Sequence, residues 1–398
     1  MLPPHRKLRI IVAGLVGQYP LGGVAWDYFH YLIGLHELGH DVYYHEDTWV
    51  WPYDPVKQSP CDTADNTVAF FQDFFAKFAP KLADRWHYVL LHEKHFGMDA
   101  AAFSEISRTA DIYLNVSGAC MFPDDLSPKC LKVFLDTDPG YNQIMLKERF
   151  AWSENVDRWC KQVADHDRHL TYAENIWAED SLMPRLNFKW NPTRCVVSLK
   201  SWESVKNSPI PANAPMSTVM TWDWFRGKLI YNGVEYGSKG VEFEKFHDLP
   251  PRVKMPLALA IGGFKAPVGQ LQRDNWRIID AHTATLTPAS YQHLIQTSAG
   301  EWSVAKNVYV ALRTGWFSCR TACYLAAGRP AVVQDTAWSK FIPSGKGVIG
   351  FETMDEAIAG LSAIAADPAA HRAAAYEIAR EYLAPDRVLP GMIESIYT

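Results

Sequence analysis

Several features that mark specialised classes of protein are missing from this sequence. The seven cysteines are scattered along the chain and form neither a CxxC pair nor a zinc-like spacing. An odd number of scattered cysteines is typical of reduced thiols, so we expect a cytoplasmic protein rather than a disulfide-stapled secreted domain. The apolar run near the start ends at Gly17, which is too short for a membrane span or a signal sequence.

Charge and metal-binding motifs are also sparse. The net charge is −5, so no general basic surface for nucleic acid or an anionic membrane is expected, although a local basic groove remains open. His166, Asp167 and His169 lie close together, but no HExxH or comparable spacing accompanies them, and we predict no metal. The 15 tryptophans and 18 tyrosines either line a cleft that stacks sugars or bases, or fill large cores.

The length and the pattern of apolar runs predict a two-domain α/β protein. A chain of 398 residues supports two domains. Apolar runs bounded by polar or glycine-rich loops are typical of buried parallel strands, which we expect at 8–15, 41–45, 111–116, 132–135, 170–173, 217–222, 257–261, 276–280, 308–312, 331–333 and 348–351. Helices are expected at 24–38, 70–86, 291–298, 320–327, 354–365, 368–382 and 388–396. Two successive βα series predict two Rossmann-like, doubly wound domains that face a central cleft.

One stretch near the C-terminal end, Ser303–Thr336, predicts an anion site. It is expected to form a strand at 308–312, a loop, a helix that ends at Gly328, and a second strand. Such a unit places the free N–H groups of a helix start, at Ser318–Thr321, beside the carboxyl edge of a parallel sheet. Helix N-termini at this edge bind phosphate well, and Arg320 adds a positive charge.

Glycines and carboxylates supply further candidate site residues. Gly22 and Gly23 follow the first strand, where they either let a ligand approach or form a tight turn, because a full GxGxxG is missing. Asp138 ends a strand, where it could serve as a general base or cap the next helix. Asp27 and His30 lie three residues apart on a predicted helix, so they either share a face toward a cleft or are exposed to solvent.

Two more segments are informative. Gly262 and Gly263 close the strand expected at 257–261, where a phosphate or sugar could approach the backbone, and Lys265 follows them. The aromatic and proline-rich segment 48–60 is predicted to be a loop. Its rings line an acceptor pocket or cover a core.

Several motifs together resemble those of GT-B glycosyltransferases. They are GQYPLGGVAWDY and the following residues to Pro55, DTDP at 136–139, HDRHLTYAEN at 166–175, residues 231–250, and Ser303–Thr336. The resemblance implies an acceptor-binding domain at 1–190, a nucleotide-sugar-binding domain at 191–375, and a C-terminal helix at 376–398 that packs back on the first domain.

The resemblance also implies roles for individual residues. The expected donor is a nucleoside diphosphate sugar, most simply a UDP-sugar, bound without a divalent metal. The residues that the resemblance and the local pattern assign to the donor site are Gly22, Gly23, Gly262, Gly263, Lys265, Trp316, Ser318, Arg320, Thr321, Gln334 and Asp335. Of these, Gln334 and Asp335 are expected to touch sugar hydroxyls, and Trp316 to flank the donor.

The sequence departs from the family pattern at the catalytic positions. Many inverting relatives carry a histidine near the position of Gly23, and many retaining relatives carry a Glu-x7-Glu whose places fall near Gly315 and Cys323. The stereochemical outcome therefore stays open, and the candidate bases in order are Asp27, Asp138 and His30. The acceptor is a small molecule, a glycan or lipid headgroup, or a hydroxymethylated DNA base. Epimerisation of a nucleotide sugar, or binding without catalysis, is an alternative.

Overall fold

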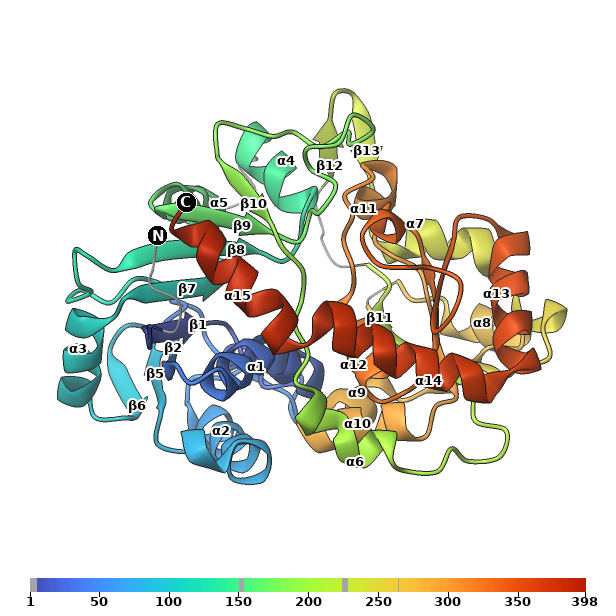
Figure 1. The fold of residues 1–398 in the computed structure, drawn as a ribbon, viewed down its shortest axis with the longest axis horizontal. Coiled ribbons are helices and arrows are strands. Elements are labelled where there is room, and N and C mark those ends of the chain that lie inside the picture. The colour runs from blue at the N-terminus through green and yellow to red at the C-terminus, as the bar shows by residue number, and fades with distance from the viewer. Residues whose placement is uncertain (1–5, 150–153, 224–227, 264) are drawn as a thin grey trace.

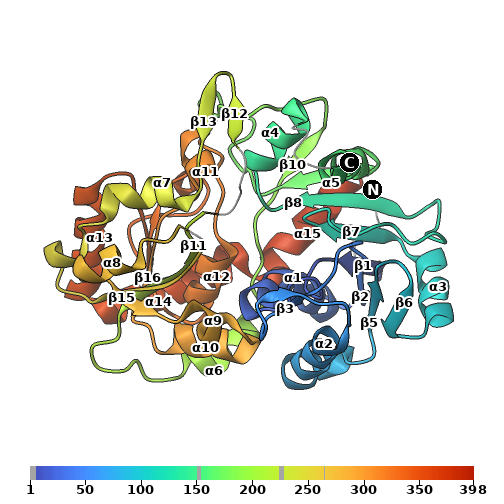
Figure 2. The same cartoon turned by 180° about the vertical axis from the view of Figure 1, so that it is seen from behind.

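The computed structural model describes residues 6–149, 154–223, 228–263 and 265–398. Figure 1 shows two lobes side by side, each built around a twisted sheet, and Figure 2 shows the same lobes from behind. Strands of both sheets run toward the junction between the lobes, so the loops that follow their carboxyl ends meet there. This is the arrangement in which doubly wound proteins place their ligands.

The first sheet has, among the described residues, eight strands in the order β10-β9-β8-β7-β1-β2-β5-β6. Neighbouring strands are parallel except for β6, which runs antiparallel to β5. The strands are β1 (Arg9–Ala13), β2 (Asp41–Glu46), β5 (Trp86–Leu90), β6 (Lys94–Gly97), β7 (Ile112–Val116), β8 (Leu131–Asp136), β9 (Arg168–Thr171) and β10 (Trp190–Pro192). Central β1 is buried on both faces, which explains its continuous apolar run.

The two faces of this sheet are covered differently. Ile10 and Val12 of β1 pack in the large core beneath α1 (Gly22–Glu37) and α2 (Asp65–Phe78), whereas Ile11 and Ala13 pack in a small core with Phe103 of α3 (Ala100–Thr109). The remaining elements of this part of the chain are the short pair β3 (Tyr53–Asp54) and β4 (Ser59–Pro60), η1 (Pro80–Leu82), α4 (Tyr141–Glu148) and α5 (Glu154–Ala164).

The second sheet is fully parallel, in the order β15-β14-β11-β16-β17-β18. Its strands are β11 (Met216–Thr221), β14 (Leu257–Gly262), β15 (Arg277–Ile279), β16 (Gly300–Ser303), β17 (Ala331–Gln334) and β18 (Val348–Phe351). The order reverses between β11 and β16, which makes the carboxyl ends of these two strands the switch point of the sheet.

Helices cover both faces of the second sheet, and a hairpin extends from it. The hairpin is β12 (Leu229–Tyr231) with β13 (Val234–Tyr236), as the Asn232-Gly233 turn predicts. The helices are α6 (Leu199–Lys206), α7 (Lys239–Phe243), η2 (Glu244–Phe246), η3 (Pro250–Arg252), α8 (Val268–Arg273), α9 (Ala281–Thr285), α10 (Pro288–Gln296), α11 (Asn307–Ala311), α12 (Cys319–Ala326), η4 (Trp338–Lys340), α13 (Met354–Ala366) and α14 (Pro368–Ile378).

The chain ends by returning to the first lobe, as expected. After α14, the π-helical turn η5 (Ala379–Leu383) leads into α15 (Pro385–Ile396), which crosses the junction in Figure 1. Gly34 of α1 provides the space for this crossing, because a Cβ there would lie 2.7 Å from the Pro385 side chain. Arg168 Nε donates to the Ile396 carbonyl at 2.7 Å. No helix in the described ranges is long and apolar enough to cross a membrane.

Two secondary-structure predictions were wrong. The run at 308–312 forms helix α11 instead of a strand, because Val308, Tyr309 and Leu312 bury one face at helical spacing; the strand before it is β16. The helix expected at 70–86 begins earlier, at Asp65, and ends at Phe78, so that Trp86 starts strand β5. Strands β5 and β6 and helix α3 were not predicted from the sequence.

Candidate active site

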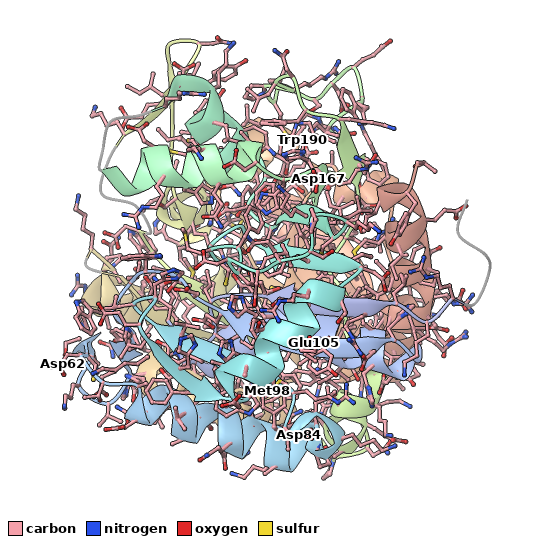
Figure 3. The ribbon with its side chains drawn as sticks, turned by 90° about the vertical axis from the view of Figure 1, so that its left-hand side faces the viewer. Asp62, Asp84, Met98, Glu105, Asp167 and Trp190 are labelled. Atoms are coloured by element: carbon pink, nitrogen blue, oxygen red, sulfur yellow. The ribbon has the colours of Figure 1, made fainter. Side chains whose placement is uncertain are left out.

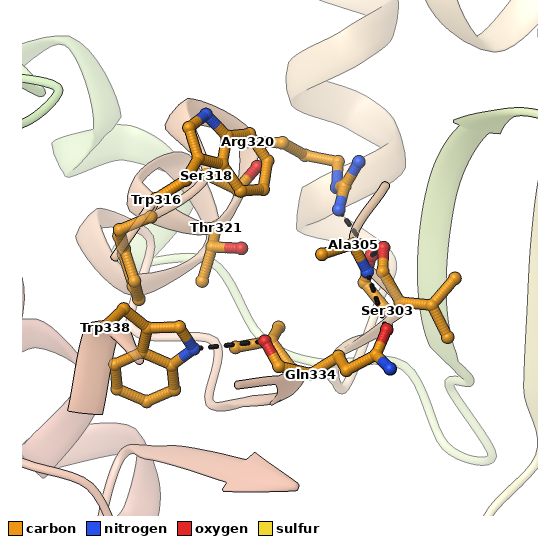
Figure 4. Close-up of a pocket in the computed structure, with 11 residues that line it drawn as sticks. Ser303, Ala305, Trp316, Ser318, Arg320, Thr321, Gln334 and Trp338 are labelled. Atoms are coloured by element: carbon orange, nitrogen blue, oxygen red, sulfur yellow. Dashed lines mark hydrogen bonds between the residues drawn. The ribbon is translucent and has the colours of Figure 1, made fainter. Parts of the chain in front are cut away.

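The carboxyl ends of β16 and β17 meet the start of α12 around a recess. This recess is narrow, with a free volume of about 10 Å³, and is lined by residues of the Ser303–Ala305 segment, the loop before α12, the first turn of α12 and the end of β17. Figure 4 shows these side chains, with the Thr321 hydroxyl directed toward the open centre. A second recess, of about 230 Å³, is lined by Val219, Met220, Thr221, Lys239 and Lys306.

The N-terminus of α12 faces the first recess. Ser318 is the N-cap residue and has an extended backbone, and the helical bonds begin with Ala322 N–H to the Ser318 carbonyl at 3.0 Å. The N–H groups of the first turn therefore have no carbonyl partner inside the helix. Within the described chain, the buried Thr321 Oγ1 also lacks a hydrogen-bond partner. The structure thus brings Ser318, Arg320, Thr321 and Trp316 to one recess, as the sequence predicted.

Arg320 forms part of the wall between the two recesses. Its guanidinium donates to Glu301 Oε1 at 2.5 Å, to the Val219 carbonyl at 2.7 Å and to Ser303 Oγ at 2.5 Å. Burial alone would lower the pKa of Arg320, but the Glu301 carboxylate more than offsets this effect, so the pKa is raised and the side chain stays charged. Glu301 is completely buried. Arg320 is therefore a fixed charge whose field is partly neutralised.

Lys239 is the functional candidate that sequence reasoning missed. It is the first residue of α7, it is half-buried, and it lines the second recess together with Lys306. Burial, and next the positive charges of Arg320 and Lys306, lower the pKa of Lys239 well below its usual range. An anion that enters the recess would therefore stabilise the charged form of this lysine. Its only sequence signal is its position directly after the turn that follows the β12–β13 hairpin.

Gln334 and Asp335 occupy different environments. Gln334 lines the first recess, where its Oε1 accepts from Ala305 N–H at 3.1 Å and its Nε2 donates to Glu242 Oε2 at 2.6 Å. Asp335 instead accepts hydrogen bonds from the backbone and hydroxyl of Ser339. It is not among the residues that line the recess. The structure therefore brings only Gln334 of this pair to the site.

The four glycines predicted for the donor site lie in two different places. A Cβ on Gly22 would lie 2.2 Å from the Thr287 carbonyl oxygen, and one on Gly23 would lie 3.2 Å from the Tyr291 ring, because α1 crosses α10 closely. This helix crossing accounts for both glycines without a ligand. Gly262, at the end of β14, is open: no described atom lies within 4 Å of the place that a Cβ would take there. Gly263 has a φ of +109°, and Lys265 is exposed beyond it.

Asp27 lies on α1 at the junction of the lobes, next to the first residue of α12. Its carboxylate accepts a hydrogen bond from the Cys319 thiol, and burial raises its pKa to about 6 despite this contact. Its Oδ1 is shielded from solvent and has no partner among the described atoms. Asp27 is thus a carboxylate with one free oxygen and a pKa close to neutrality.

Asp138 connects the lobes through an ion pair. Lys306 Nζ lies 2.5 Å from Asp138 Oδ2, and the Tyr309 hydroxyl donates to Oδ1. Neighbouring Asp136 is completely buried and accepts hydrogen bonds from three side chains, and burial raises its pKa to about 6. The Asp138 side chain therefore reaches the second recess through Lys306 and does not cap α4, whose N-cap is Gly140.

His30 does not reach either recess. It is buried beneath the junction, where its ring nitrogens lie 3.2 Å from Ser198 N and 3.2 Å from Trp202 Nε1. Burial lowers its pKa to about 3. Asp27 and His30 do share a face of α1, since Asp27 contacts Cys319 and His30 Nε2 lies 3.8 Å from Cys323 Sγ, both on α12, but the buried His30 ring is also held by Trp202 of α6. The geometry does not support His30 as a base.

The side chains of His166 and His169 form hydrogen bonds with backbone carbonyl groups. His166 Nδ1 lies 2.7 Å from the Gln162 carbonyl, and His169 Nε2 lies 2.8 Å from the Val163 carbonyl. In the part of the chain that the structure describes, no group of three or more His, Cys, Asp or Glu side chains is arranged to hold a metal ion.

Comparisons with known proteins address the fold. No protein-family model and no curated protein matches the sequence. Among solved structures, an α-glucosyltransferase in complex with UDP and a 13-mer DNA is 11% identical, with a TM-score of 0.60 and coverage of 98% of this chain and 100% of that chain. AviGT4, a glycosyltransferase involved in avilamycin A biosynthesis, is 13% identical, with a TM-score of 0.52 and coverage of 98% and 97%.

A glycosyltransferase from Rickettsia africae is also similar, at 11% identity and a TM-score of 0.51 over 98% of both chains. These likenesses extend over nearly the full length of each protein. Together with the two doubly wound sheets and the returning C-terminal helix, they show that this chain has the GT-B fold.

Proposed function

We propose that the protein is a glycosyltransferase that moves a sugar from a nucleoside diphosphate sugar to an acceptor hydroxyl. The observation that carries the proposal is the meeting of Lys239, Lys306 and the α12 N-terminus at the switch point between β11 and β16. Helix N–H groups and lysines stabilise a diphosphate, and they stabilise the leaving group as its negative charge grows.

The electrostatics of Lys239 support a diphosphate as the natural occupant. Burial and two neighbouring cations lower the pKa of Lys239. A bound dianion would offset the repulsion from these cations and stabilise the charged form of the lysine. The same cations lead us to propose that transfer is metal-independent. UDP is our first choice of nucleotide, because an α-glucosyltransferase of the same fold has been solved in complex with UDP.

We infer that Asp27 is the base, because it is the candidate with an uncommitted carboxylate oxygen. It has a free, shielded oxygen and a pKa of about 6, so it can accept a proton near neutral pH, whereas Asp138 is engaged by Lys306. In the proposed step, Asp27 takes the proton of the acceptor hydroxyl as that oxygen bonds to the anomeric carbon. The bond from this carbon to the diphosphate breaks, and its electron pair leaves with the diphosphate toward α12.

Nucleotide binding tests the donor site directly. We expect calorimetry with UDP to show that Lys239→Met weakens binding by about 10- to 100-fold, since a charge-assisted hydrogen bond contributes about 1.5–3 kcal/mol. Lys129→Met removes an exposed lysine from the first lobe and is the matched control, with unchanged affinity expected. Wild-type protein that binds no UDP, GDP or TDP and hydrolyses none of their sugars would contradict the proposal.

A further inference from the structure

A second cavity lies in the first lobe, on the sheet face opposite α1. Its volume is about 230 Å³, it is open on one side, and it is bordered by β2, β5, β6, α3 and the loop at 123–125. Figure 3 views this side of the molecule, where Glu105 marks α3. Four histidines line the cavity: His45, His87, His92 and His95. It shares no lining residue with the two recesses at the proposed donor site.

The hydrogen-bond network fixes the tautomer of His45. The Tyr113 hydroxyl donates to the Met121 carbonyl at 2.9 Å, so it must accept from His45 Nδ1, which lies 2.9 Å away. Burial, and then the nearby histidines, hold the pKa of His45 well below its usual range, so the ring is neutral. Its Nε2 is therefore left as a hydrogen-bond acceptor at the cavity wall.

Two further buried atoms at this cavity lack partners. Asp47 and His87 are each only 3% exposed, and within the described chain Asp47 Oδ1 and His87 Nδ1 have no hydrogen-bond partner. The other His87 nitrogen, Nε2, lies 3.1 Å from His95 Nδ1. Buried polar atoms are normally satisfied, and an exception at a cavity wall indicates a missing partner. These atoms suit a ligand that carries several hydroxyl groups.

Aromatic rings surround the polar groups. Phe103 stacks on His45 and His87, with ring centroids 4.8 Å and 4.2 Å apart. At the edge of the cavity, Trp49 stacks on His92 at 5.2 Å while 44% of the tryptophan stays exposed. An exposed ring next to hydrogen-bonding side chains offers a platform for the C–H face of a sugar.

The charges of the cavity disfavour an anionic ligand. Asp47, Asp124 and Asp125 line it, which disfavours a phosphate or another anion. His92 donates to Asp47, the most buried of these carboxylates, and this hydrogen bond raises the pKa of His92. Hydroxyl groups can donate to these carboxylates and to the unpartnered imidazole nitrogens without carrying a charge into the cavity.

From this arrangement we propose that the cavity is a second ligand site, which binds a neutral saccharide through hydroxyl contacts to His45, Asp47 and His87 and through stacking on Trp49. The site is independent of the donor site, so it holds whether or not the protein transfers a sugar.

Saturation-transfer NMR with maltotriose, xylotriose and chitotriose tests the proposal. We expect transfer from the wild-type protein to at least one trisaccharide, and its loss in Asp47→Ala and in Ser104→Trp. Ser104 lines the cavity from α3, so a tryptophan there fills the space without removing a charged group or a histidine. Glu105→Trp places the same ring on the exposed side of α3 and is the matched control, with transfer retained.

Circular dichroism and UDP titration establish that each variant is folded, and UDP affinity is expected to stay unchanged in all of them. The proposal is overturned if none of the three saccharides receives saturation, or if Ser104→Trp still transfers to them as the wild type does. Binding of spermidine or Zn²⁺ that depends on Asp47, without saccharide binding, would also overturn it and would assign the cavity to a cation.

Discussion

Replacing Asp27 with asparagine should stabilise the protein, with an effect that depends on pH. The substitution keeps the shape of the side chain and removes its charge. Burial raises the pKa of Asp27 from 3.8 to about 6. This difference corresponds to about 3 kcal/mol, because each pKa unit is about 1.36 kcal/mol.

The direction of this pH dependence is set by which state, folded or unfolded, binds the Asp27 proton more tightly. The folded state holds the proton up to about pH 6, whereas the unfolded chain loses it near 3.8. Ionisation of Asp27 therefore favours unfolding as the pH rises from about 4 to about 6, and the penalty is constant above that range. The asparagine side chain does not titrate, so the variant is not destabilised by ionisation of this side chain.

Urea denaturation of both proteins across the pH range measures this effect. We expect the variant to be more stable by less than about 1 kcal/mol at pH 4 and by about 3 kcal/mol at pH 8. Asp84→Asn, at an exposed aspartate, controls for the change in net charge and should show no such dependence. A stability difference that does not change with pH would refute the desolvation argument.

The same variant separates stability from chemistry. If Asp27 is the base, Asp27→Asn binds UDP normally but loses turnover, and the wild-type rate falls below about pH 6 as the carboxylate becomes protonated. An active variant would exclude Asp27 as the base and leave the stability prediction intact.

Three other substitutions probe the framework of the protein. Glu301→Gln leaves buried Arg320 without its ion-pair partner and should lower the free energy of unfolding by about 3–5 kcal/mol in urea titrations; a loss under about 1 kcal/mol would contradict the pairing. Gly22→Ala forces a Cβ against the Thr287 carbonyl and should cost about 1–3 kcal/mol, whereas Gly391→Ala, a helix position with no described atom near the added Cβ, should gain up to about 1 kcal/mol. Equal melting temperatures for these two glycine variants would refute the close crossing.

Strands were the most predictable part of this fold. The runs around β1 and β18 are buried on both sides or end at clear turn residues, so their apolar pattern alone locates them. The error at 308–312 arose because five residues with Val308, Tyr309 and Leu312 fit a strand or one helical face equally well. Tertiary packing decides between these two possibilities, and the sequence window does not contain it.

The site was predictable only in its backbone frame. The start of α12 lies where expected, because the helical pattern up to Gly328 marks it, although the strand expected at 308–312 is helix α11. The electrostatic details depend on partners that are distant in sequence, such as Glu301 with Arg320, or Lys306 with Asp138. Lys239 was missed for the same reason, because nothing near it in the chain reveals the two cations that face it in space.

The return of α15 means that the chain crosses between the lobes twice, once before α6 and once at the end of η5. The two crossings are tied to each other, because Val197 N–H donates to the Leu383 carbonyl at 2.9 Å. Two chain connections that are hydrogen-bonded to each other restrict the relative motion of the lobes. The lobes can bend about this connection, but they cannot slide apart or rotate freely. Any relative motion of the two lobes is therefore expected to open the side of the molecule away from this connection, and not the side where the two crossings meet.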